Sequence, residues 1–275
     1  MEMSLSPEQR EIAAMARGFS RDVIGPAQER MVETGEFPYE TWHRWSELGM
    51  AGIMIPEEYG GSGQDALSYI LAVEEVATVS QTFALIWQVH VLVGNMYALL
   101  GTDKQKADWL PRFATGECLG AFALTEPGAG SDPGGMSTRA VREGNDAWRV
   151  NGTKIFISNA GTEISDGTVL MATTGERADG RKAISSFILP TGTPGYELGQ
   201  SFKKMAWQGM DNRELILRDV VLPDENMLGP EGGGLKQALG ALNLGRIVFG
   251  ALGSALTQAC LDESLAYTKD RKQFG

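Results

Sequence analysis

The sequence predicts an α+β protein of more than one domain, in which helices come first, strands follow and a long helix comes last. Three observations support this prediction. Apolar residues recur at helical spacing in the first 115 residues, strand-like runs with Gly and Pro boundaries follow, and a long apolar helix is expected at about Leu235–Tyr267. We therefore expect a helical domain at 1–117, an antiparallel β domain (a barrel or sandwich) at 118–228 and the start of another helical domain at 229–275.

Helix start signals are strong in the first domain. Ser6-Pro7-Glu8-Gln9 combines a capping box with proline at the first helical position, and Thr102-Asp103-Lys104-Gln105 is a second capping box before a shorter helix. Between these starts we expect further helices at about Pro38–Leu48, Asp65–Thr78 and Gln81–Leu100. The first domain is therefore predicted to be all helical.

Strand signals fill the second domain. The segment Trp148–Ile157 contains Asn151-Gly152, a dipeptide typical of two-residue turns, so a β-hairpin is expected there. β-Branched residues with Gly and Pro boundaries predict further strands at Thr168–Thr174, Ile184–Leu189 and Glu214–Leu222.

The long helix near the end is apolar on nearly every side, which predicts burial on every side. Arg246 is its lone internal charge, and a buried arginine needs a partner. Two roles stay open for it: contact with a substrate, or a salt bridge to an acidic residue in the core. The sequence stops soon afterwards, so we expect another domain or a partner chain to pack against this helix. The apolar positions are Leu239, Leu242, Leu244, Ile247, Val248, Phe249, Leu252 and Leu256.

Composition argues against several classes of protein. The chain has 24 Lys and Arg against 35 Asp and Glu, a formal net charge of −11, and it has no large basic run, so nucleic-acid binding is not expected. The two cysteines, Cys118 and Cys260, lie on segments that are predicted to be buried. Without a CxxC or Cys/His cluster, neither a disulfide framework nor a metal site is predicted.

No segment predicts export or membrane insertion. The N-terminus lacks the basic flank and apolar run of a signal peptide. The most apolar window, Phe83–Leu100, includes Gln88, His90 and Asn95, which favours a buried helix over a membrane span. We therefore expect a cytoplasmic enzyme.

The stretch Ala121–Asp132, AFALTEPGAGSD, lies where the helical part meets the strand part. Phe122 and Leu124 alternate as in a strand, and Pro127 then opens a glycine-containing loop. Such a loop exposes backbone N–H groups to a ligand, although most are plain exits from strands. A dinucleotide fingerprint does not fit, because Pro133 stands where its third glycine is needed.

Five ordered motifs in this chain resemble those of the acyl-CoA dehydrogenase family. The resemblance covers the whole chain and implies an N-terminal helical domain, a β-barrel middle domain and a C-terminal four-helix bundle, of which only the first long helix is present. The motifs are Ala121–Asp132, Val150–Asn159, Lys204–Gly209 (KMAWQG), Asp219–Pro223 (DVVLP) and Tyr267–Gly275 (YTKDRKQFG).

The resemblance implies a flavoenzyme. Family members bind FAD, oxidise an acyl-CoA thioester to its trans-2-enoyl form and pass electrons to an electron-transfer flavoprotein. A homotetramer or homodimer with FAD at a subunit interface is also implied, as is an acyl-CoA or acyl-carrier substrate.

Carried over by position, the resemblance also assigns site residues. Ser131, Asn243 and Arg246 would contact substrate, and Arg271 would reach the FAD pyrophosphate, usually on a neighbouring subunit. The full set expected at FAD is Phe122, Leu124, Thr125, Gly130, Ser131, Phe156, Ile157, Ser158, Arg271 and Phe274.

Two of these positions depart from the family pattern. Phe156 stands where many members have Trp, so it keeps a packing surface without an indole N–H. Ser158 stands where Thr is common and keeps the hydroxyl for the flavin edge. The competing interpretation makes Phe122 and Phe156 part of the β-domain core and Thr125 a simple strand residue.

No residue of the chain is assigned as the catalytic base. Family members use a glutamate late in the bundle, which would lie beyond Gly275, or one on the long helix next to the arginine, where this chain has Gly245. Glu126 belongs to the cofactor-loop motif instead. An acyl-CoA dehydrogenase is therefore the leading hypothesis. The alternatives are an acyl-CoA oxidase or related flavin monooxygenase, and a non-catalytic FAD- or CoA-binding subunit that takes its base from a partner chain.

Overall fold

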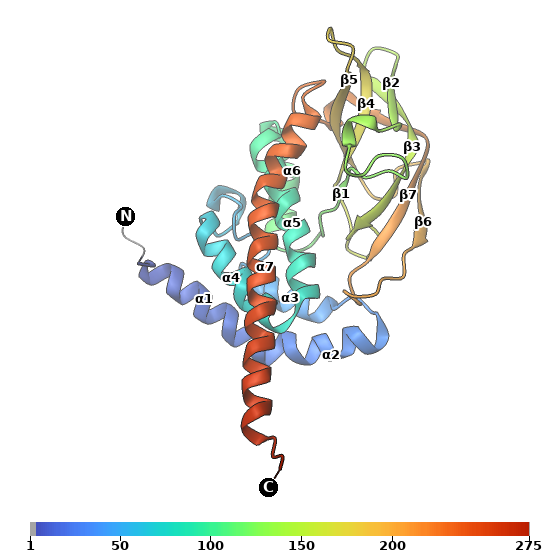
Figure 1. The fold of residues 1–275 in the computed structure, drawn as a ribbon. Helices are drawn as coiled ribbons and strands as arrows, with labels where there is room; N and C mark the ends of the chain where they lie inside the picture. Colours follow the sequence, from blue (N-terminus) through green and yellow to red (C-terminus); the bar gives the residue numbers. More distant parts are fainter. Residues whose placement is uncertain (1–3, 275) are drawn as a thin grey trace.

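A computed structural model describes residues 4–274 and places a group of helices beside a twisted sheet, with the last helix running along the helical group (Figure 1). The α-helices are α1 (Pro7–Phe19), α2 (Gly25–Thr34), α3 (Tyr39–Glu47), α4 (Ala66–Val79), α5 (Gln81–Leu100), α6 (Asp103–Ala114) and α7 (Gly234–Asp270). The helical N-terminal part that the sequence predicts is confirmed.

Side chains cap the starts of α1, α4, α5 and α6. Both expected capping boxes form, at Ser6 with Gln9 and at Thr102 with Gln105. Asp65 caps α4 by accepting a hydrogen bond from the Ser68 N–H at 2.7 Å. Each cap pairs an amide that the first helical turn leaves without a partner.

Helix α2 has no counterpart in the sequence prediction. The chain leaves α1 through a π-helical turn, Ser20–Ile24, and continues directly into α2. Pro26 is tolerated because it lies in the first turn, and Gly35 ends the helix with a φ of 72°.

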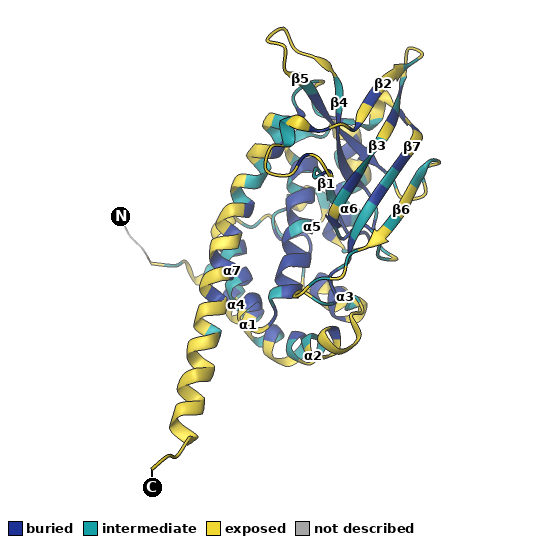
Figure 2. Cartoon of the chain, turned by 45° about the vertical axis from the view of Figure 1, so that its right-hand side comes forward, coloured by how far each residue is buried: buried dark blue, intermediate teal, exposed yellow. Residues whose placement is uncertain are grey.

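The centre of the helical part is α5, which is buried along most of its length (Figure 2). Trp45 and Trp87 pack edge to face with a centroid distance of 4.9 Å. His90 accepts a hydrogen bond from the Gly120 N–H at Nδ1 and lies 3.1 Å from the Phe113 carbonyl oxygen through Nε2. Burial lowers the pKa of His90 to about 4, so this imidazole is a neutral packing group at physiological pH.

The sheet part contains a single eight-stranded sheet in the order β6-β7-β3-β2-β4-β5-β8, with β1 paired to β4. It does not close into the expected barrel, because β6 and β8 are the ends of the order and do not pair within residues 4–274. The strands are β1 (Phe122–Ala123), β2 (Arg139–Glu143), β3 (Ala147–Ser158), β4 (Thr168–Glu176), β5 (Lys182–Leu189), β6 (Tyr196–Ser201), β7 (Asn212–Pro223) and β8 (Met227–Leu228).

The prediction of a hairpin turn at Asn151-Gly152 is wrong, because β3 continues through this dipeptide. Strands β2 and β3 do form a hairpin, but its turn lies near Gly144. Gly152 instead lies at a shift in the pairing register with β7. A side chain at this position would meet the Thr138 Cα at 2.7 Å, so glycine is needed there for close approach of two backbone segments.

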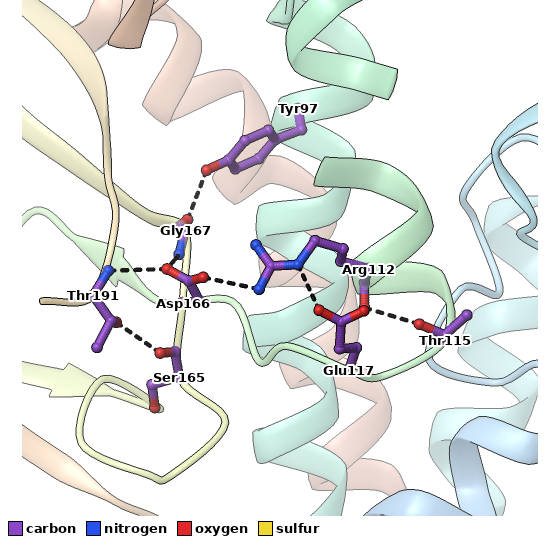
Figure 3. Close-up of polar contacts among 8 residues, drawn as sticks. All are labelled: Tyr97, Arg112, Thr115, Glu117, Ser165, Asp166, Gly167 and Thr191. Carbon is purple, nitrogen blue, oxygen red and sulfur yellow. Dashed lines mark hydrogen bonds and ion pairs between the residues drawn. The ribbon is translucent and has the colours of Figure 1, made fainter. Parts of the chain in front are cut away.

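Polar contacts join the helical part to the sheet part (Figure 3). Arg112 on α6 pairs with Glu117 at 2.7 Å and with Asp166 at 3.0 Å, just before β4. The Tyr97 hydroxyl donates to the Gly167 carbonyl oxygen at 2.8 Å. Asp166 also accepts a hydrogen bond from the Thr191 N–H at 2.9 Å, so one carboxylate connects α6 with two loops of the sheet part.

Helix α7 is buried along one face only, which corrects the expectation of burial on every side. Its inner face includes Val248 and Leu252, whereas Ile247 and Phe249 are about half exposed, at 57% and 50%. Beyond Cys260 the helix projects past the other elements and is exposed throughout (Figures 1 and 2). Nothing within residues 4–274 covers the outer face, which is why its apolar pattern does not translate into burial.

The same exposure corrects one further expectation. Cys260 is exposed, whereas Cys118 is buried as predicted, and both are free thiols. Two helices within residues 4–274, α5 and α7, are long and apolar enough to cross a membrane by length and composition alone, and 72% of the apolar window of α5 is buried in the protein.

We expect Gly152→Ala to lower the free energy of unfolding by about 1–3 kcal/mol, because the new methyl group would force apart the Thr138 backbone and β3. Chemical denaturation followed by circular dichroism measures the effect. The control is Gly175→Ala in β4, where an added Cβ meets nothing within 4 Å. Equal stability losses in the two variants would contradict this account of Gly152.

Candidate functional site

A cavity of about 630 Å³ lies between the sheet and helices α5 and α7. This volume is within the usual range for small-molecule sites. Most of its lining is apolar or aromatic, with a few polar side chains placed among these groups. The lining residues are Leu85, Gln88, Val89, Leu92, Phe122, Thr125, Phe156, Ser158, Lys204, Trp207, Met210, Asn212, Leu242, Gly245, Arg246 and Phe249.

The cavity brings together several of the residues that the sequence singled out. Phe122 and Thr125 come from the junction stretch, Phe156 and Ser158 from the end of β3, and Arg246 from α7. These segments are far apart in the chain, yet they meet at one cavity.

Other expected site residues do not line this cavity. Ile157 points into the sheet core and Leu124 packs against the core between sheet and helices. Gly130 and Ser131 are exposed on the loop after β1. Asn243 is exposed on α7 and holds the Arg246 guanidinium.

Phe156 faces the cavity because the alternation of inward- and outward-facing side chains along β3 shifts near the end of the strand. The pairing of β3 with β7 shifts between Lys154 and Ile157, and Phe156 has a φ of 58°. Both Lys154 and Ile157 are therefore buried, while Phe156 is 56% exposed and its ring lies 4.7 Å from that of Phe202. Phe156 is not a core residue, which removes that part of the competing interpretation.

A buried ion pair supports the wall formed by the junction stretch. Lys154 on β3 is 2.8 Å from a Glu126 carboxylate oxygen and donates a second hydrogen bond to the Leu124 carbonyl oxygen at 3.1 Å. Glu126 also accepts hydrogen bonds from the backbone N–H groups of Ser137 at 2.6 Å and Thr138 at 3.0 Å. The pair thus ties the loop after β1 to both β2 and β3.

The surroundings keep both members of this pair charged at neutral pH. Burial by itself would raise the pKa of Glu126, but hydrogen bonds from Lys154 and Thr138 and the Lys154 charge outweigh it and lower the pKa to about 2. Burial lowers the pKa of Lys154 to about 8, and the Glu126 carboxylate opposes a larger shift.

Four polar side chains of the cavity wall were not assigned from the sequence: Gln88, Lys204, Trp207 and Asn212. Trp207 has a φ of 60° and lies in the KMAWQG motif. The resemblance of this motif indicates that the segment matters but assigns no role to its residues. Lys204 donates to the Met210 carbonyl oxygen at 2.7 Å, and burial lowers its pKa. Asn212 donates to the Ser158 hydroxyl at 3.2 Å.

No carboxylate lines the cavity among residues 4–274. Gly245, where some members of the resembled family have a glutamate, faces the cavity without a side chain. Within the same residues, no group of three or more His, Cys, Asp or Glu side chains could hold a metal ion.

Three family descriptions match the chain in order. They are the N-terminal domain of acyl-CoA dehydrogenase over residues 6–117, its middle domain over 121–220 and its C-terminal domain over 232–275. The chain belongs to the acyl-CoA dehydrogenase family.

Individual relatives agree with this membership. Within the family, the probable acyl-CoA dehydrogenase YngJ of Bacillus subtilis is 43% identical over 276 residues, covering 100% of this chain and 72% of that protein. CarC, a subunit of the caffeyl-CoA reductase-Etf complex of Acetobacterium woodii, is 38% identical, with 99% of this chain and 72% of that protein covered. A solved glutaryl-CoA dehydrogenase from Mycobacterium smegmatis in complex with FADH2 has a TM-score of 0.89 at 33% identity, with 98% of this chain and 67% of that chain covered.

In this acyl-CoA dehydrogenase family member, Arg246 is exposed, which corrects the expectation of a buried charge with an acidic partner. Its guanidinium is held by the Asn243 side chain, one helical turn away, and it lines the cavity. Water reaches Arg246 and it forms no salt bridge within residues 4–274, so the salt-bridge interpretation is wrong for this part of the chain.

The last two expected cofactor residues lie far from the cavity of their own chain. Arg271 is the residue that caps the C-terminal end of α7, and Phe274 follows it, fully exposed with a φ of 59°. At a rise of about 1.5 Å per residue, Arg271 lies roughly 37 Å along α7 from Arg246. One copy of the chain therefore cannot bring Arg271 to the cavity that Arg246 lines.

We expect Glu126→Gln to lower the free energy of unfolding by about 3–5 kcal/mol, because it leaves the Lys154 ammonium buried without a counter-charge. Urea denaturation measures the loss, and the double variant with Lys154→Met should recover much of it. Asp108→Asn, which breaks the exposed Lys104–Asp108 pair, is the matched control and should change stability by about 0.5 kcal/mol or less. A Glu126→Gln loss no larger than this control would contradict the role of the buried pair.

The pair also predicts how stability changes in acid. The folded-state pKa of Glu126, about 2, is below its ordinary value of 4.5, so its contribution is complete above that value and is lost as the pH falls toward 2. Unfolding free energies between neutral and acidic pH should therefore fall more steeply for the natural protein than for Glu126→Gln. Parallel curves would show that Glu126 does not contribute to acid unfolding.

Proposed function

We propose that this protein is a cytoplasmic FAD-dependent dehydrogenase that converts an acyl-CoA or acyl-carrier thioester into its trans-2-enoyl form. One observation carries the proposal: the cavity gathers Phe122 and Thr125, Phe156 and Ser158, and Arg246 from three distant segments of the chain. Family membership supplies the reaction class, and the two free thiols are consistent with a reducing compartment.

The residues present fit a flavin. A flat aromatic ring system suits a cavity that exposes Phe122 and Phe156, and the Thr125 hydroxyl, which makes no hydrogen bond within residues 4–274, is free to contact a polar ring edge. The FADH2 complex of the Mycobacterium smegmatis relative supports the same cofactor. When bound, FAD supplies the acceptor for the β-hydride.

The side chains of this protein would bind and orient the reactants. Ser158 accepts its hydrogen bond from Asn212, so its own hydroxyl proton can be donated to the flavin edge. Phe156 would cover the ring and exclude water from it. Arg246, held by Asn243, would offer a positive charge to the anionic CoA portion, together with polar contacts from Ser131 on the exposed loop.

The base for the α-proton would come from outside residues 4–274. No carboxylate lines the cavity in this part of the chain, and Glu126 is already held by Lys154 and two backbone N–H groups. A longer form of the chain or a partner chain would supply the carboxylate beside Gly245.

We further propose a homotetramer or homodimer in which Arg271 and Phe274 complete the FAD site of a neighbouring copy. Both residues are exposed at the projecting end of α7, and Arg271 has no ion-pair partner within residues 4–274. A guanidinium can grip pyrophosphate oxygens with two hydrogen bonds. The electron acceptor would be an electron-transfer flavoprotein, as the relative CarC belongs to such a complex.

The natural full-length protein, purified under mild conditions, should show the visible absorbance bands of oxidised FAD. Anaerobic addition of an acyl-CoA should bleach these bands, and electron-transfer flavoprotein should restore them. A protein without flavin would refute the proposal. Reoxidation by oxygen instead would identify an oxidase or monooxygenase, and bound flavin without bleaching by any thioester would favour a non-catalytic subunit.

Arg271→Gln should weaken FAD binding by about 10- to 100-fold, the usual effect of losing a charged hydrogen bond. Fluorescence titration of the apoprotein with FAD measures the affinity. Lys269→Gln removes a neighbouring exposed charge and should leave the affinity nearly unchanged. Equal effects of the two substitutions would show that Arg271 acts only through net charge.

A further inference from the structure

Gln88 on α5 is a buried polar side chain that has no hydrogen-bond partner within residues 4–274. Only 6% of its surface is exposed, and its amide makes no hydrogen bond to any of residues 4–274. It lines the cavity between α5 and α7. The proposed reaction at the flavin does not use this side chain.

Gly245 on α7 leaves room for the Gln88 amide. A Cβ at position 245 would lie 3.3 Å from Gln88 Nε2, closer than ordinary van der Waals contact. Most of the other cavity residues on these two helices are apolar, and only Arg246 has a hydrogen-bonding side chain. The apolar ones are Leu85, Val89, Leu92, Leu242 and Phe249. The amide is therefore presented to the cavity from a helix, α5, whose other cavity residues are apolar.

An amide in this position discriminates between ligands. Its oxygen accepts and its nitrogen donates two hydrogen bonds, so a plain alkyl chain filling the cavity would leave all of these groups unsatisfied. Burying an unpaired polar group is unfavourable, and sites built around such groups reject ligands that lack the matching group.

We propose that Gln88 selects acyl groups that carry a neutral hydrogen-bonding substituent, such as a hydroxyl or carbonyl, over unsubstituted alkyl chains. This inference rests on the proposed function and specifies its substrate class. A carboxylate is a poorer match at this wall, because an amide cannot replace the hydration of a buried charge. Both cations that line the cavity are already engaged: Arg246 is exposed and donates to Asn243, and Lys204 donates to the Met210 carbonyl oxygen.

The test compares binding of paired thioesters to the natural full-length, FAD-loaded protein. The probes are butyryl-, valeryl- and hexanoyl-CoA and their ω-hydroxy counterparts, with dissociation constants taken from the change in the flavin spectrum. At one chain length at least, the hydroxylated thioester should bind about tenfold more tightly than its alkyl counterpart, the usual effect of one satisfied buried hydrogen bond.

Gln88→Leu should abolish or invert this preference, because it replaces the amide with an apolar group of similar size. Leu85→Met changes another cavity residue on α5 without adding a polar group, and it should keep the preference of the natural protein. A ratio near one at every chain length, or an unchanged ratio in Gln88→Leu, overturns the role of Gln88. Failure of every thioester to change the flavin spectrum would instead refute the proposed function, and this inference with it.

Discussion

The buried pair of Glu126 and Lys154 is the constraint on which the cavity depends. One carboxylate neutralises the Lys154 ammonium and also accepts hydrogen bonds from two successive backbone amides, those of Ser137 and Thr138. Its effect reaches the neighbouring backbone, where the Ile155 N–H donates to the Thr125 carbonyl oxygen at 2.9 Å. The loop after β1 and the end of β3 are therefore held at a fixed separation. That separation defines the wall to which Thr125 and Phe156 contribute.

Local sequence signals predicted the elements that short-range chemistry determines. The capping boxes at Ser6 and Thr102 form because each cap pairs residues three apart in the same turn. Helix α5 forms within its predicted bounds, Gln81–Leu100, because Ser80 caps its start and a nearly continuous apolar sequence fills the core. The motif pattern likewise pointed to Phe122 and Phe156, which the structure places at one cavity.

The remaining features depend on partners that are distant in sequence. Asn151-Gly152 has a hairpin signature, but Gly152 is there to allow close approach of Thr138, which no local pattern records. Closure of a barrel would require β6 to pair with β8, and neither strand carries a signal for its partner. In the sequence, Gln88 only favours a buried helix over a membrane span. The absence of a hydrogen-bond partner for its amide within residues 4–274 becomes visible only when α5 and α7 are placed together.

The register shift near the end of β3 determines how freely position 156 can change during evolution. Regular alternation would couple position 156 to the packing of the sheet interior, so any exchange there would demand compensating changes among core neighbours. The shifted register instead leaves Lys154 and Ile157 to satisfy the interior and frees Phe156 from it. Substitutions at position 156 can therefore change the size and polarity of the side chain that faces the cavity without disturbing the packing of the sheet. Selection for stable folding thus acts on Lys154 and Ile157, whereas selection for ligand binding can act separately on Phe156.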